Sequence, residues 1–207
     1  MQPSTATSFP HEFQQLLTLY ERLALPCEEA HLPAILHDLI TTLEQGYELI
    51  VALDDDAYVL PPRHLVASSI GAHYRHHLEH VQMLLQNLRG GIVDYDCRPR
   101  SARVEQDRDF ALAMTRDLIQ HLSALAGEDL DVPLTIAHRT CTQDNARCAP
   151  STLRRELLFL LSHTIHHYAL IKLIAESLGQ EVHGHFGVMP STLAHLGASS
   201  PASERSS

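Results

Sequence analysis

The stretch ELLFLLSHTIHHYALIKLIAESL, residues 156–178, decides the fold of this chain. Its apolar residues recur at helical intervals on both sides of a group of histidines. His163 and His167 are four positions apart, so on a helix they lie about 40° apart and one turn along the axis. The pattern predicts a mostly buried helix from Pro150 to about Leu178 that presents two imidazoles on one side.

A second histidine cluster lies in SSIGAHYRHHLEHVQMLLQNL, residues 68–88. At about 100° per residue, four histidines of this segment fall within one arc beside an apolar face. A helical projection places three of them inward and His76 at the outer edge of the arc. The segment therefore predicts a helix with a histidine stripe partly inside the protein. The stripe consists of His73, His76, His77 and His80.

The rest of the chain supplies further helical segments joined by polar stretches. Four long helices with polar linkers predict an all-α fold, a four-helix bundle formed by residues 28–196. Residues 1–27 read as an N-terminal extension, and residues 197–207 as a disordered tail. The expected long helices span residues 28–53, 65–89, 101–126 and 150–178, with a short extra helix over 12–23 and a small β-hairpin over 132–145.

Composition argues against several classes of partner. A formal charge of −10 without a Lys/Arg cluster disfavours nucleic-acid binding. The N-terminus lacks an export signal and no apolar run is of membrane-spanning length, so we expect no membrane partner. Four scattered cysteines predict reduced thiols in the cytoplasm. Among them, Cys141 and Cys148 with His138 are an alternative zinc site, but no fourth ligand is evident.

Histidine is the compositional anomaly, with 16 residues, seven of them in the two clusters. A buried histidine can simply hydrogen-bond to a backbone carbonyl. Several neutral imidazoles packed together need a partner for every nitrogen, however, and a metal ion supplies one. The two clusters on apolar helices therefore predict a bound divalent transition metal.

At this point the residues carry a resemblance. The runs S-I-G-x-H-x-R-H-x-L-E-H, residues 69–80, and S-H-T-I-H-H-Y-A-L-I, residues 162–171, resemble the DinB/YfiT-like superfamily of metalloenzymes. The resemblance implies an up-down-down-up four-helix bundle, often a homodimer. It also implies a zinc, nickel or iron ion on one histidine of the second helix and an H-x3-H pair of the fourth.

Carried onto this chain, the resemblance gives His76, His163 and His167 as the metal ligands. The helical projection instead favours His73, His77 or His80 as the more inward histidine, and both assignments stay open at this point. We expect the remaining polar groups of the two helices to line the cleft or to hold the ligands in place. These neighbours are His73, His80, Glu79, Glu156 and His166.

Two classes of function follow from such a site. Three neutral histidines leave a metal an open position, which is typical of catalytic rather than closed structural sites. The resemblance implies thiol transfer, isomerisation or hydrolysis of a small molecule, with a low-molecular-weight thiol as one candidate partner. The alternative is a bundle that binds metal for structure or sensing without turnover. The absence of an H-E-x-x-H motif argues against a zincin-type peptidase.

Overall fold

The computed structural model describes residues 32–62, 66–138 and 147–198. Within these ranges the chain is mainly helical, with one small sheet. The predicted extra helix over residues 12–23 lies outside the described residues. The helices are α2 Ala34–Ala52, α3 Asp55–Val59, α4 Ile70–Asn87, α5 Ala102–Gln106, α6 Arg108–Ser123, α7 Leu153–Ser177 and α8 Pro190–Ala198, with 3-10 turns η1 Leu88–Gly90 and η2 Tyr95–Cys97. The strands are β1 Ile92–Asp94, β2 Pro133–His138 and β3 Arg147–Thr152.

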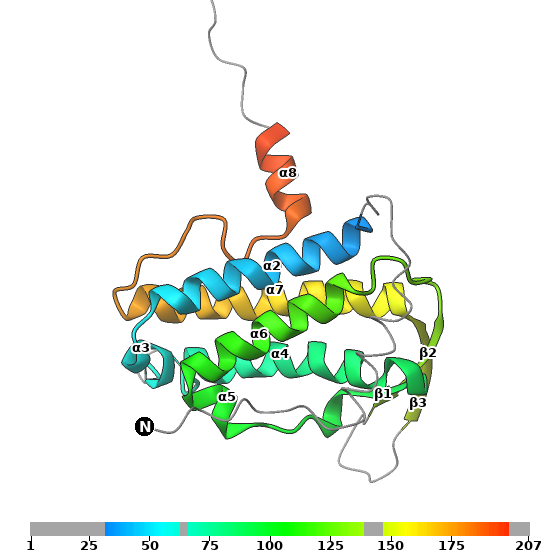
Figure 1. The fold of residues 1–207 in the computed structure, drawn as a ribbon. Helices are drawn as coiled ribbons and strands as arrows, with labels where there is room; N and C mark the ends of the chain where they lie inside the picture. The colour runs from blue at the N-terminus through cyan, green and yellow to red at the C-terminus, as the bar shows by residue number, and fades with distance from the viewer. Residues whose placement is uncertain (1–31, 63–65, 139–146, 199–207) are drawn as a thin grey trace, which may run out of the picture.

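Four of these helices form the predicted bundle. Figure 1 shows α2 and α7 running in one direction while α4 and α6 run in the other, so the up-down-down-up order is confirmed. α7 packs against α2 and α4, and α6 packs against the same two helices from the other side. Helix α8 projects away from the bundle (Figure 1).

The core between the helices is aliphatic with three tyrosines. Burying each large apolar side chain contributes about 1.5–3 kcal/mol, so the bundle is stabilised chiefly by these contacts. Tyr74 donates its hydroxyl hydrogen to Thr115, whose own hydroxyl donates to the Ala111 carbonyl, so this buried polar pair is satisfied. The largest fully buried side chains are Tyr58, Tyr74, Tyr168, Leu36, Leu39, Leu43, Ile50, Ile70, Leu78, Leu84, Leu118 and Leu122.

The start of α7 differs from the prediction by three residues. Pro150, Ser151 and Thr152 form the end of β3, not the first turn of the helix. Thr152 is extended and its hydroxyl accepts a hydrogen bond from the Arg155 N–H, 3.3 Å away, which caps the helix. Strand pairing therefore holds the residues that the pattern assigned to the helix.

The single helix expected over residues 101–126 is wrong, because the chain forms two helices there. Asp107 lies between them in an extended conformation, with φ −117° and ψ 99°. Its carboxylate accepts a hydrogen bond from the Phe110 N–H at 2.9 Å and so begins α6. A side-chain cap overrides the apolar periodicity at this point.

The small sheet confirms a hairpin before α7, although its second strand, β3, lies beyond the predicted end at residue 145, and it adds a strand. β2 and β3 pair antiparallel, with Pro133 opposite Thr152. β1 pairs parallel to β2, with Ile92 opposite Thr135, and this strand was not predicted. The polar segment DYDCRPR, residues 94–100, belongs to this arrangement: it ends β1, forms η2 and places the Arg98 side chain at 13% exposure.

α7 corrects one further expectation. It is the only helix in the described part of the chain that is long and apolar enough to cross a membrane, although no run of that length was predicted. Half of its most apolar window is buried inside the protein. A core helix of a bundle has the same length and composition.

Gly71 marks the closest approach of α4 to α5, and Gly71→Ala should be destabilising. A Cβ at this position would fall on the backbone oxygen of Glu105 and within 2.9 Å of the Tyr58 ring. We expect the free energy of unfolding in urea to fall by about 1–3 kcal/mol. Gly90→Ala is the matched control, because a Cβ there meets no atom within 4 Å. Equal stability of both variants would contradict this packing.

Candidate metal centre

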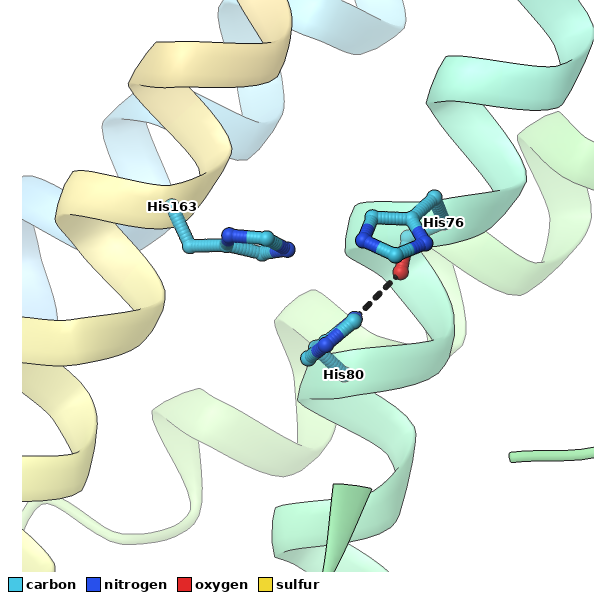
Figure 2. A group of neighbouring side chains, drawn as sticks. All are labelled: His76, His80 and His163. Atoms are coloured by element: carbon cyan, nitrogen blue, oxygen red, sulfur yellow. Dashed lines mark hydrogen bonds between the residues drawn. The ribbon is translucent and has the colours of Figure 1, made fainter. Parts of the chain in front are cut away.

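The antiparallel packing of α4 and α7 brings histidines of both helices into one cluster. His76 and His80 come from α4 and His163 from α7, and Figure 2 shows the three rings converging between the helices. The ring centroids of His76 and His80 lie 4.5 Å apart, those of His80 and His163 4.3 Å, and those of His76 and His163 5.0 Å. One nitrogen from each ring lies within 4.8 Å of the other two, a spacing that can hold a metal ion.

His167 extends the cluster along α7. Its ring centroid lies 4.6 Å from that of His163 and 4.5 Å from that of His76. The structure thus brings the predicted set together, but the three nitrogens it groups most closely belong to His76, His163 and His80 instead of His167. Both sets share His76 and His163. The identity of the third ligand remains the prediction made from the resemblance.

Hydrogen bonds orient two of these rings. Nδ1 of His80 lies 2.6 Å from the backbone oxygen of His76, so it donates and Nε2 is left as the ligand atom. Nδ1 of His167 lies 3.1 Å from Nδ1 of His73, so one of the two rings donates to the other. In metal-binding histidines, a hydrogen bond from the ring nitrogen that does not bind the metal fixes the orientation of the ring. His73, which we expected beside the site, occupies that position for His167.

Burial keeps the cluster neutral. It lowers the pKa of His76 to about 3, of His80 and His163 to about 4, and of His167 to about 2. Removal from water is the largest cause for each ring, and for three of them neighbouring histidines lower the pKa further. Neutral imidazole is the form that binds metal. His163 Nε2 is also buried without a hydrogen-bond partner, which fits a position reserved for a metal ion.

Glu79, predicted beside the ligands, lies about one turn along α4 from His76 and is buried against the segment that precedes α5. Its side chain is 1% exposed and accepts a hydrogen bond from the Ser101 N–H at 2.6 Å. The Nε atoms of Arg75 and Arg98 lie 4.0 and 3.9 Å from the same carboxylate. Arg75 also pairs with Glu105 of α5. Glu79 therefore ties the segment between η2 and α5 to the helix that carries the histidines.

Glu156 is linked to the cluster by Tyr95, which donates a hydrogen bond to it and stacks on His80. The carboxylate is fully buried and accepts hydrogen bonds from the Tyr95 hydroxyl at 2.8 Å and the Ser151 hydroxyl at 2.5 Å. The Tyr95 ring stacks on His80, with centroids 5.4 Å apart and planes at 24°. Sequence reasoning missed Tyr95, because nothing local indicates that the 3-10 turn folds over α4.

Phe159 is a second missed neighbour. Its ring stacks on His163, with centroids 5.4 Å apart and planes at 20°. It lies four residues before His163, so helical spacing was a signal that could have found it. Tyr95 and Phe159 also contact each other, at 5.3 Å between centroids. Together they cover the His80 and His163 end of the cluster with aromatic surface.

Two other histidines of α4 and α7 border the cluster. His166 is exposed and contacts the ring of His167 at 5.4 Å. His77, one of the inward candidates of the helical projection, is fully buried between Tyr74 and Tyr168, with ring centroids 4.8 and 5.0 Å away. It belongs to the aromatic core.

Comparison with known proteins places the chain in a family. The model of the DinB superfamily matches residues 39–171, which include α4, α7 as far as Ile171 and all the clustered histidines. The chain belongs to the DinB superfamily. A curated relative, FK506-binding protein 5 of Rhizopus delemar, is 35% identical over 106 residues, which are 51% of this chain. The aligned part of this DinB chain spans 28% of that relative's length. No solved structure matches this chain.

We expect the metal-free DinB protein to lose stability as the pH falls from 6.5 to 5, a range above the one in which carboxylates titrate. In the unfolded chain His80 and His163 take up protons near pH 6.5, whereas in the folded protein they stay neutral to about pH 4. The unfolded state thus binds more protons, so the free energy of unfolding falls as pH is lowered from 6.5 to 5. Urea midpoints measured across this range check the effect.

Two variants sharpen this measurement. His80→Gln should make the loss of stability smaller, because it removes one buried titrating group. Gln86→Ala should leave the slope unchanged, since it changes an exposed residue of α4 that carries no titrating group. A urea midpoint for the wild-type protein that stays constant from pH 6.5 to 5 would show that the cluster does not exclude protons.

Proposed function

We propose that this DinB protein is a metal-dependent enzyme that acts on a small molecule. One observation carries the proposal: neutral imidazoles from α4 and α7 converge on a common position, where His163 Nε2 is buried without a partner. Imidazole ligands suit zinc, nickel and iron, the three metals that we propose for this site. A bound metal of this kind supplies a Lewis acid, which polarises a substrate oxygen or activates a nucleophile.

The chain's own residues hold and shape the site. His76 and His163 would bind the metal in either ligand set, and His167 is the third ligand that we propose. His73 orients His167 through the hydrogen bond between their Nδ1 atoms. Tyr95 and Phe159 exclude water from one end of the cluster by stacking on the rings of His80 and His163.

Access to the site favours turnover over a purely structural role. His76 and His163 are only partly buried, whereas closed core positions such as His77 are fully buried. A small molecule can therefore approach the cluster from solvent. We propose thiol transfer, isomerisation or hydrolysis as the reaction, with a low-molecular-weight thiol as the first substrate to test. A non-catalytic metal-binding protein is the second candidate.

The cellular setting forms part of the same proposal. Cys97 and Cys148 are exposed at the surface and form no disulfide in the described part of the chain, which supports a reducing, cytoplasmic environment. We further propose that the protein acts as a homodimer and binds neither nucleic acid nor membrane. The net charge of −10 supports the exclusion of nucleic acid.

Metal removal and reconstitution test the proposal. Untagged protein, stripped by a chelator and then dialysed against zinc, nickel or iron(II), should retain about one ion per chain. His163→Ala and His167→Ala should each abolish tight binding while helical content is kept, because the aliphatic core supplies most of the stability. Elemental analysis and circular dichroism measure both.

His37→Ala is the control, since His37 is exposed on α2 away from the cluster and its variant should bind metal like the wild type. Metal content far below one per chain after reconstitution would overturn the metal site. The reaction is tested with the loaded protein on thiol-transfer, isomerase and hydrolase substrates. Full metal content with no turnover in any assay would favour the non-catalytic candidate.

A further inference from the structure

His80 lies in the cluster but outside the three-histidine set that the resemblance predicts. Its side chain is buried, at 5% exposure, and it follows His76 by one helical turn. Its ring centroid lies 4.5 Å from that of His76 and 4.3 Å from that of His163. Figure 2 shows the rings of His76 and His80 projecting from α4 into the space that His163 enters from α7.

We propose that His80 is a fourth protein ligand of the metal, beside His76, His163 and His167. This inference rests on the proposed metal site and defines its ligand set. With Zn–N bonds of about 2.1 Å, each ring centroid lies about 3.2 Å from the ion, so tetrahedral ligands have centroids about 5 Å apart. Five of the six pairs among these rings have centroids 4.3 to 5.0 Å apart, and the sixth pair, His80 and His167, makes no ring contact, since the two rings contact His76 and His163 from different sides.

The hydrogen bonding of His80 matches that of a ligand. Nδ1 is used in the 2.6 Å bond to the His76 carbonyl, which leaves the lone pair of Nε2 for the metal. A backbone carbonyl that accepts the other ring N–H is a common companion of metal-bound histidine. The ring of Tyr95, held by its hydrogen bond to Glu156, stacks on His80 and limits its rotation.

A fourth imidazole changes what the site can do. Four nitrogen ligands fill the tetrahedral shell of zinc, so a substrate would have to expand that shell or replace one ring. Metals that accept five or six ligands keep further positions open. With His80 as a ligand, zinc has no coordination position left for a substrate, whereas a metal that takes five or six ligands has one.

Cobalt(II) absorption tests the number of imidazole ligands. Metal-free wild-type protein titrated with cobalt(II) should give the intense visible bands of a tetrahedral site. In His80→Gln these bands should weaken and shift as solvent replaces the ring, and zinc affinity should fall more than 100-fold. His73→Gln removes only an orienting partner, so its cobalt spectrum should keep the tetrahedral bands and its zinc affinity should fall by about 10–100-fold.

X-ray absorption of the zinc-loaded wild-type protein counts the imidazoles without any variant, and we expect four. Three imidazoles, or a His80→Gln spectrum identical to the wild type, would overturn the fourth ligand while leaving the metal site intact. A wild-type protein that binds none of cobalt, zinc, nickel and iron(II) would instead refute the proposed function. Circular dichroism of His80→Gln shows whether the variant is folded.

Discussion

The structure depends on one constraint: polar imidazoles must be buried between two apolar helices without being charged. α4 and α7 bury histidines next to leucine, isoleucine and tyrosine side chains, and removal from water keeps the rings neutral. Each buried nitrogen then needs a partner, which the chain supplies in part through the His76 carbonyl and the His73–His167 contact. His163 Nε2 is buried without a partner where the clustered rings converge and marks the place where a ligand from outside the chain fits, whereas the two unpaired nitrogens of His77 are enclosed in the aromatic core.

The surrounding elements hold these two helices in register. Glu79 fixes the segment after η2 to α4 through Ser101 and Arg98, and Glu156 fixes Tyr95 over His80. Both carboxylates are buried, and removing one partner of such a group is costly because the other charge is left uncompensated. The acidic residues predicted to lie beside the ligands thus support the site through the segment that covers it.

Sequence reasoning found what repeats locally and missed what pairs at a distance. The H-x3-H spacing and the apolar flanks were enough to predict α7 and its two imidazoles, and the bundle order is confirmed. The three-residue strand β1 has no local signal, because its partner in β2 lies about 40 positions later. The break at Asp107 was missed because one capping carboxylate outweighed a continuous apolar period. Tyr95 could not be found because its position over His80 depends on that strand.

The parallel pairing of β1 with β2 also bears on the order in which the molecule assembles. Ile92 meets Thr135 only after the whole stretch containing α5 and α6 has folded back, whereas a hairpin such as β2–β3 closes a short loop. Pairings of high sequence separation lose more chain entropy before they gain contacts, so they raise contact order and slow folding. The turn that seats Tyr95 directly follows β1. The aromatic cover of the histidines is therefore among the last parts of the chain to become ordered, and the first expected to open in hydrogen exchange.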